Sequence, residues 1–201
     1  MTHADRFKVD VPEGQCGAWR VERFIVANGD IKALYYALHG RPVLPGTYTR
    51  LIRDGGHDPM MSDTPSEIRD HLEALILFNE PWVKRILING LGLGVVLKMA
   101  LKQSHVEHID VVEIEPEILQ LVSPSYSDSR IAFHLADAYT IEWPKTSRWD
   151  VAWHDIWPSI CTDNLDGIAR LHRKYGRRVL IQQSWMRDWL KAKRRREQRW
   201  Y

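Results

Sequence analysis

The chain has 201 residues, 44% of them hydrophobic, and its 28 Lys and Arg against 26 Asp and Glu give a formal net charge of +2. This composition excludes a disordered chain and suits one globular domain with a sizeable core, while the balanced charge indicates no particular class of partner. No apolar run approaches the ~18 residues of a membrane span, so we expect no contact with a membrane.

The N-terminus and the cysteines indicate the cellular compartment of the protein. The first 14 residues place no apolar core behind their charges, which argues against a secretion signal. Cys16 and Cys161 lack the spacing of metal ligands. We therefore predict a cytoplasmic protein with two free thiols and no metal site.

Residues 1–59 are predicted to form a small, partly β extension. Its first part, residues 1–15, has the character of a loose lead-in. Strands are expected at Trp19–Val26 and at residues 47–53, because both segments alternate in polarity. Residues 30–38 form either a short helix or a further strand, since periodicity does not separate the two.

A helix start follows near residue 64. Thr64 can cap the helix, Pro65 suits its first position, and Glu67 can reach back to complete a capping box. The helix is then expected to bury an apolar stripe at helical spacing, made of Ile68, Leu72, Leu75 and Ile76.

Residues 86–117 carry the clearest pattern: an apolar run, a glycine turn, a helical segment and a second apolar run. This is the strand–turn–helix–strand unit that binds a nucleotide at the end of its first strand. A side chain at Gly90 or Gly92 would keep the backbone from a ligand. Glu113, at the tip of the second strand, is placed to accept hydrogen bonds from a ribose. Val95 stands where a dinucleotide fingerprint has its last glycine, which favours S-adenosylmethionine over NAD.

Three more strands are expected at residues 131–135, 150–155 and 179–183. Together with the first two, they predict an α/β, Rossmann-like parallel sheet with flanking helices. Residues 163–175 are predicted to be one of these helices, with four inward residues: Leu165, Ile168, Ala169 and Leu171. An uncovered sheet edge is a liability, so a partner subunit, the N-terminal extension or the last helix should cover it.

Four segments follow one another in a familiar order: ILINGLGLG, VEHIDVVEIEPEIL, ADAY and RWDVAWHD. Over roughly residues 60–185 they resemble the core of the class I S-adenosylmethionine-dependent transferases, and most closely the spermidine synthase group. A complete class I methyltransferase continues with two more strands, whereas 16 residues follow Trp185 here. The chain therefore resembles a member of this class that is truncated at its C-terminus, and the resemblance implies a sheet of five parallel strands in the order 3-2-1-4-5.

The resemblance implies that the cofactor is S-adenosylmethionine, its decarboxylated form or methylthioadenosine. It implies that Asp137 binds the adenine amino group and that Ala138 gives a backbone contact. The residues expected to contact the cofactor are Asn89, Gly90, Gly92, Gly94, Glu113, Ile114, Asp137, Ala138 and Asp155.

The end of the fourth strand is where chemistry is expected. Spermidine synthases carry D-x-x-D-P there, and this chain keeps Asp155 and Pro158 but has Trp157 in place of the second acid. Asp155 is the candidate catalytic residue because it can accept a proton from an incoming nucleophile. Trp157 either stacks on the substrate or belongs to the core. Alternation along the strand should turn His154 away from Asp155.

The segment before the first core helix borders the active site in the resembled group. Its charged residues are either substrate contacts or ordinary capping and surface residues. They are Asp63, Glu67, Arg69, Asp70 and His71, of which Asp63, Glu67 and His71, together with Trp157, make up the predicted substrate set.

The sequence thus favours a small S-adenosylmethionine-dependent transferase, in the first place a methyltransferase acting on a small molecule. An aminopropyltransferase using decarboxylated S-adenosylmethionine is the alternative, and a non-catalytic module that kept the cofactor fold is a third. A homo-oligomer is expected. Residues 186–201 form a basic C-terminal helix or tail that either meets nucleic acid or, as we prefer, is a solvated helix face.

Overall fold

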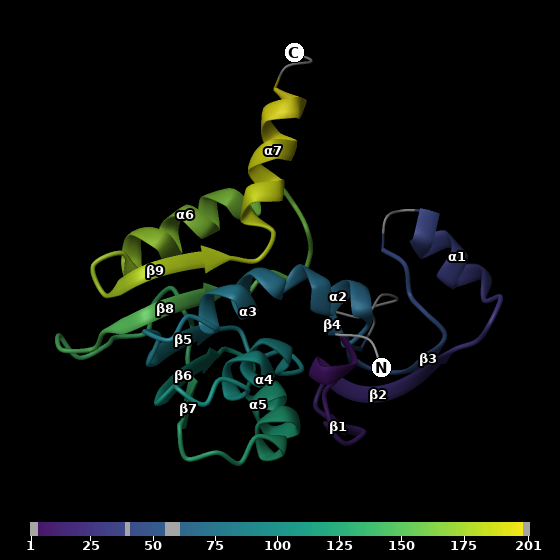
Figure 1. The fold of residues 1–201 in the computed structure, drawn as a ribbon, viewed down its shortest axis with the longest axis horizontal. Helices are drawn as coiled ribbons and strands as arrows, with labels where there is room; N and C mark the ends of the chain where they lie inside the picture. The colour runs from purple at the N-terminus through teal and green to yellow at the C-terminus, as the bar shows by residue number, and fades with distance from the viewer. Residues whose placement is uncertain (1–3, 39–40, 55–60, 199–201) are drawn as a thin grey trace.

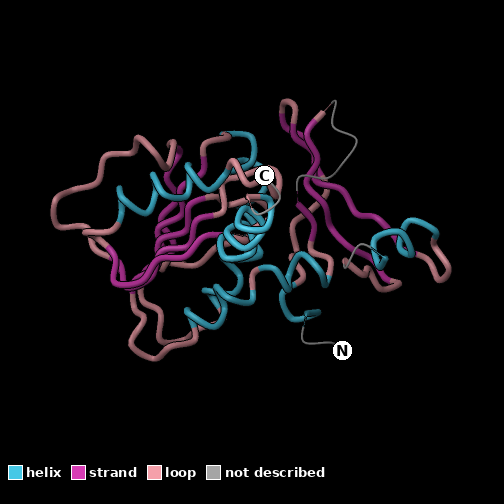
Figure 2. The backbone as a smooth tube through the Cα atoms, turned by 90° about the horizontal axis from the view of Figure 1, so that it is seen from above, coloured by secondary structure: helices cyan, strands magenta, loops and turns pink. Residues whose placement is uncertain are grey.

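The structure is a computed structural model that describes residues 4–38, 41–54 and 61–198. It contains a four-stranded antiparallel sheet, β1 to β4, and a five-stranded parallel sheet, β5 to β9 (Figure 1). Figure 2 shows the two sheets apart, with helices on both faces of the parallel sheet.

The parallel sheet has the predicted topology. Its order is β7-β6-β5-β8-β9, with every neighbouring pair parallel, which is 3-2-1-4-5 when its strands are counted along the chain. The predicted α/β class is therefore confirmed. The strands are β5 (Arg85–Asn89), β6 (His108–Glu113), β7 (Ile131–Leu135), β8 (Trp149–His154) and β9 (Val179–Ser184).

Alternate residues of the central strands enter two different cores. Ile86 and Ile88 of β5 belong to the larger core, whereas Leu87 between them belongs to a second core that contains Leu171 and Tyr175 of α6. Both cores exclude water, so β5 is buried on both faces, as in other parallel sheets. The helices of the larger core are α3 (Leu72–Phe78), α4 (Val95–Leu101) and α5 (Pro116–Val122), and α6 (Asn164–Tyr175) lies on the other face.

The N-terminal segment forms its own sheet in the order β1-β2-β3-β4. The strand predicted at Trp19–Val26 is confirmed as β2, and the next predicted strand is β3 (Gly46–Arg53). The segment that was open between helix and strand is helix α1 (Ile31–Leu38). The remaining strands are β1 (Gly14–Cys16) and β4 (Met61–Ser62), and η1 (Ala4–Phe7) precedes them.

Within the predicted lead-in of residues 1–15, the described residues from Arg6 onward are not loose, and the prediction was wrong for them. Phe7, Val9 and Val11 are buried in the larger core, where they cover apolar surface that would otherwise meet water. The small sheet also contacts α5, because the Trp19 indole N–H donates to the Glu115 carboxylate at 3.3 Å.

The helix predicted from residue 64 differs in three respects. It divides at His71 into α2 (Pro65–Asp70) and α3. Thr64 makes no capping hydrogen bond, because its hydroxyl pairs with Ser62 and Glu67 pairs with Arg41. The inward face of α3 also differs, because Ala74 and Phe78 are buried while Leu72 and Ile76 are exposed. In α6, Ala169 is likewise exposed rather than inward.

The chain continues beyond β9 as helix α7 (Arg187–Glu197), which anchors itself through the buried Leu190 (Figure 1). The edge strand β9 leaves Leu180 74% exposed and Ile181 39% exposed. Both cysteines are free thiols, as predicted. In the parts of the chain that the structure describes, no helix is long and apolar enough to cross a membrane. The boundary between residues 59 and 60 lies outside the described residues, and the division into 1–59, 60–185 and 186–201 stays a prediction.

Asp63 joins the N-terminal segment and β3 to the start of α2, and it does not line the cavity described below. Its buried carboxylate accepts hydrogen bonds from the backbone N–H groups of Val9 at 3.1 Å and Thr49 at 2.6 Å. The structure therefore places Asp63, which was expected to contact substrate, outside the cavity and in a structural position.

Asp63→Ala should lower the free energy of unfolding by about 1–3 kcal/mol, because two buried N–H groups lose their acceptor. Urea denaturation followed by fluorescence measures this change. Asp63→Asn, which keeps one carbonyl oxygen as an acceptor, should lose less. A variant of unchanged stability would contradict this structural role.

Candidate functional site

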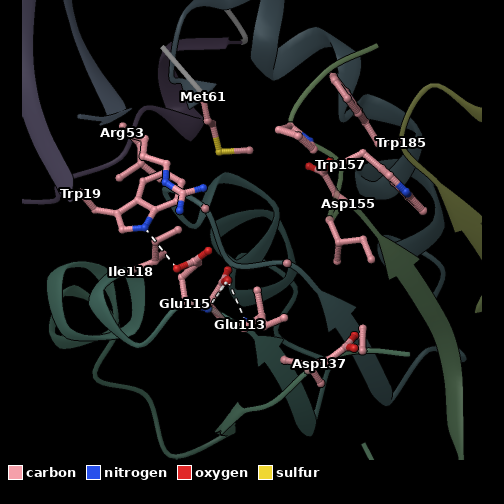
Figure 3. A pocket seen from close by; sticks show the side chains of 18 of the residues that line it. Trp19, Arg53, Met61, Glu113, Glu115, Ile118, Asp137, Asp155, Trp157 and Trp185 are labelled. Atoms are coloured by element: carbon pink, nitrogen blue, oxygen red, sulfur yellow. Dashed lines mark hydrogen bonds between the residues drawn. The ribbon is translucent and has the colours of Figure 1, made fainter. Parts of the chain in front are cut away.

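A cavity of about 390 Å³ lies at the carboxyl ends of β5, β6 and β8 (Figure 3). This is the size of a small-molecule site, and it is the place where open parallel sheets bind ligands. The turn after β5, the tips of β6 and β8, helix α2 and the N-terminal sheet all contribute side chains or backbone to its wall.

The glycine turn after β5 forms the floor of the cavity. Gly90 has φ +98°, and a Cβ there would lie 1.9 Å from the carbonyl oxygen of Asp155. Gly92 has φ +50° and faces the thioether of Met61. Both glycines line the cavity as predicted, whereas Gly94 lies outside it and faces the ring of Tyr126.

Asn89 also lies behind the cavity rather than in it. Its buried side-chain amide is 2.7 Å from Nδ1 of His154. His154 continues to Gln182 at 3.2 Å and is turned away from the cavity, as the alternation of the strand predicted. Burial lowers the pKa of His154 to about 3, so it carries no charge at neutral pH. Asn89 and Gly94 are therefore supports of the turn and not cavity-lining residues.

Glu113 fixes the geometry where β6 meets the turn. One carboxylate oxygen accepts from the N–H of Leu91 at 2.9 Å, and the other accepts from Ile114 and Glu115 at 2.8 and 3.0 Å. Each carboxylate oxygen has a second lone pair, so capacity remains for ligand hydroxyls. Glu113 lines the cavity and is 6% exposed.

One end of the cavity, at the tips of β6 and β7, is lined by both apolar and polar residues. Ile114 lines the cavity and is 59% exposed, which leaves an apolar face free to cover a flat ring. Asp137 accepts from the N–H of Tyr139 at 2.7 Å through one oxygen, so the other oxygen remains for a ligand donor. Ala138 lines the same end. The structure thus brings Glu113, Ile114 and Asp137 together around one cavity.

Acids gather at the opposite end, near the tip of β8. Asp155 lies there with its side chain 10% exposed, and burial together with the nearby Glu67, Asp70 and Glu113 raises its pKa to about 8. A carboxyl group with this pKa is largely protonated at pH 7, and a cation placed beside it would favour its charged form. Such perturbed groups cluster at functional sites.

His71 and Arg41 complete this acidic end. The Arg41 guanidinium bridges Glu67 at 2.8 Å and Asp70 at 2.7 Å. His71 Nε2 lies 3.7 Å from Asp155, too far for a hydrogen bond, and burial with the charge of Arg41 lowers its pKa to about 4. His71 is therefore neutral beside Asp155. Glu67 and His71 line the cavity, as predicted.

Aromatic side chains bound the acidic end. Trp157 packs against both the second core and the cluster between α6 and α7, and it also lines the cavity. Trp185, which follows β9, lies on the same side in Figure 3. Its ring stacks on His71 with a centroid distance of 6.5 Å.

The sequence did not predict the wall that the N-terminal sheet supplies. Trp19, Arg53 and Met61 line the cavity from the side opposite Asp155 (Figure 3). Arg53 lies over the ring of Trp19 at 5.5 Å, and it forms no ion pair with any residue that the structure describes. No local pattern marks these residues, because their place depends on how the small sheet packs against the larger one.

Two comparisons with known proteins returned nothing, since no protein-family model and no curated protein sequence matches this chain. Within the described residues there is also no group of three His, Cys, Asp or Glu side chains that could hold a metal ion.

Solved structures do match. A methyltransferase from Mesorhizobium loti is 20% identical with a TM-score of 0.43 over 55% of this chain and 49% of that one. Spermidine synthase from Thermotoga maritima is 17% identical with a TM-score of 0.44 over 77% and 48%. An amino pentose methyltransferase from Micromonospora echinaspora is 19% identical with a TM-score of 0.39 over 51% and 42%. The chain spans about half the length of these proteins.

The parallel sheet is Rossmann-like in its strand order and in the glycine turn after its first strand, as the resemblance to the class I S-adenosylmethionine-dependent transferases implies.

The raised pKa of Asp155 predicts a pH-dependent stability. Between about pH 4, the ordinary carboxyl pKa, and pH 8, the folded protein binds a proton that the unfolded chain has released, so the stability of the wild type falls as pH rises. Asp155→Asn should lack this decline. Its Tm should match the wild type near pH 4 and exceed it by at least about 3 °C at pH 8.

Thermal unfolding at both pH values measures this difference. His71, whose lowered pKa makes the stability rise with pH, is present in both proteins, so its contribution cancels in the difference between their Tm values. Asp163→Asn, at an exposed position before α6, is the control and should leave both Tm values unchanged. Equal Tm values for Asp155→Asn and the wild type at pH 8 would contradict a raised pKa of the Asp155 carboxyl.

Proposed function

We propose that this protein is an S-adenosylmethionine-dependent methyltransferase acting on a small acceptor with a basic nitrogen. The observation that carries the proposal is the separation of charge within one cavity. Arg53, with no ion-pair partner in the described chain, lines the wall formed by the N-terminal sheet, and Asp155 lines the wall at the tip of β8 (Figure 3).

The residues around the cavity fit this cofactor. Glu113 has lone pairs free for ribose hydroxyls, Asp137 has a free oxygen for an exocyclic amino group, and Ile114 presents an apolar face to a purine. Gly90 and Gly92 keep the floor clear of side chains. The cavity of about 390 Å³ is within the range that holds a molecule of this size.

Arg53 favours the carboxylated form of the cofactor. A guanidinium can hold a carboxylate through two parallel hydrogen bonds, and the decarboxylated form offers no such partner. Arg53 is also close to the apolar side chains of Trp19 and Met61, whose low polarity strengthens an ion pair.

The other end of the cavity suits the acceptor. S-adenosylmethionine supplies an electrophilic methyl group, and a reaction at that group needs mainly orientation. Asp155 has a pKa of about 8 and is largely protonated at pH 7, but a cationic amine beside it would favour its charged form, which can accept the proton of that amine. Trp157 and Trp185 exclude water from this end and can stack on a cation.

An aminopropyltransferase is the second candidate, and the acidic end favours it. Glu67 and Asp155 line the cavity with Asp70 close by, and several carboxylates suit the amines of a polyamine or of decarboxylated S-adenosylmethionine. Against this, Arg41 already bridges Glu67 and Asp70, which removes part of their negative charge.

Titration calorimetry with four ligands tests the proposal: S-adenosylmethionine, its decarboxylated form, S-adenosylhomocysteine and methylthioadenosine. The wild type should bind the carboxylated pair at least about 10-fold more tightly than the decarboxylated form, or about 1.4 kcal/mol. Arg53→Gln should weaken the binding of S-adenosylhomocysteine by a similar factor. The affinity for methylthioadenosine, which has no carboxylate, should change by less than about 2-fold.

Arg23→Gln is the matched control, because Arg23 lies on β2 of the same sheet, pairs with Asp10 at 3.6 Å and does not line the cavity. It should leave all four affinities unchanged. Preference for the decarboxylated form would favour aminopropyl transfer. Binding of S-adenosylmethionine without transfer to any amine would favour a non-catalytic module, and no binding of any ligand would overturn the cofactor assignment.

A further inference from the structure

A second hollow, of about 520 Å³, lies between α6 and α7 and shares no lining residue with the cavity described above. Figure 1 shows α7 standing away from the rest of the chain, with α6 running past its base. We call this hollow the α6–α7 groove. Its lining residues are Leu165, Asp166, Ile168, Ala169, His172, Arg173, Arg187, Lys191, Arg194, Arg195 and Gln198.

The charge of the groove is one-sided. Among the residues that the structure describes, five cationic side chains line it against a single carboxylate, Asp166. Asp166 lies 3.4 Å from Arg194 and is 83% exposed, so it compensates little of the positive charge. The positive charge of the groove also acts on His172. Burial and the charges of Arg187 and Lys191 lower the pKa of His172 to about 4.

Helix α7 sorts its charges by face. Its groove residues recur at the i, i+4, i+7 and i+8 spacing of one helical face. Both of its acids, Asp188 and Glu197, lie off the groove together with the cations Lys193 and Arg196. The outer face is therefore balanced while the groove face is strongly positive. A merely solvated helix has no reason to separate its charges in this way.

We infer that the α6–α7 groove binds the sugar–phosphate backbone of a nucleic acid. Four of its five cations are arginines, whose planar guanidinium matches the oxygens of a phosphate in a bidentate manner. The groove is also long enough to follow a strand, because the α7 face from Arg187 to Gln198 extends about 16 Å. Leu165, Ile168 and Ala169 form an apolar floor against which sugars can pack.

The inference stands apart from the proposed methyl transfer, because the groove and the cavity are lined by different residues. Binding of a nucleic acid in the groove would be driven mainly by the release of counterions from its phosphates. The affinity should therefore fall steeply as the salt concentration rises. It should depend little on base sequence, since the groove offers phosphate contacts and no side-chain pattern for reading bases.

Fluorescence anisotropy with labelled 30-nucleotide single-stranded RNA and DNA of random sequence tests this inference with the full chain. The comparison is between two double variants that remove the same two charges. Lys191→Gln/Arg195→Gln alters the groove, and Lys193→Gln/Arg196→Gln alters the outer face. Far-ultraviolet circular dichroism and the affinity for S-adenosylhomocysteine check that each variant is folded.

The wild type should bind at about 50 mM salt with a Kd near or below about 100 µM, and log K should fall linearly with log salt. The groove variant should bind at least about 10-fold more weakly, and its salt slope should be about 1.4 smaller in magnitude, since each contact with a single strand contributes about 0.7. The affinity of the outer-face variant should change by less than about 2-fold.

Three results would overturn the inference. They are no binding at about 50 mM salt, equal weakening by the two double variants, or poly-glutamate competing as well as RNA at equal charge concentration. The last result would identify the groove as a site for acidic protein instead. None of these results would bear on cofactor binding in the cavity.

Discussion

The candidate site depends on the close approach of two strand ends. Gly90 follows β5 with φ +98°, and the space of its missing Cβ is filled by the carbonyl oxygen of Asp155 after β8. Two backbone hydrogen bonds hold this arrangement, from Gly90 to Val112 and from Asp155 to Asn89. Any side chain at Gly90 would separate the strand ends and would move Asp155 away from the glycine turn.

Charge is distributed unevenly in a chain whose total is close to zero. The cavity concentrates carboxyl groups at the end of β8, where burial and mutual repulsion raise the pKa of Asp155, and Arg41 offsets part of that repulsion. The α6–α7 groove concentrates cations instead. A net charge of +2 conceals both features, because it sums charges that lie on different surfaces.

Helical periodicity gave a wrong inward face for α3 for a definite reason. The predicted stripe followed the large apolar side chains of Leu72 and Ile76, whereas the buried face runs through His71, Ala74 and Phe78 at helical spacing. The predicted capping box was also wrong. The Glu67 carboxylate pairs at 2.8 Å with Arg41, 26 residues earlier in the chain, and Thr64 makes no capping hydrogen bond.

The sequence by itself determined the parallel sheet, its order, the glycine turn and the placement of Glu113, Asp137 and Asp155 at strand ends. Each of these follows from local rules, since alternation, φ above zero and the common edge of parallel strands act over a few residues. The functions of the acids were not determined in this way, because a carboxylate at a strand end looks the same whatever it binds.

Tertiary structure alone decided which residues face Asp155 across the cavity. Trp19 and Arg53 reach it from the small antiparallel sheet, through contacts such as that of Trp19 with Glu115, 96 residues apart. It also decided that cations of α7 line a hollow together with residues of α6. Contacts of this range depend on how whole elements pack together, and that packing is set by the sum of many buried surfaces rather than by any short pattern in the chain.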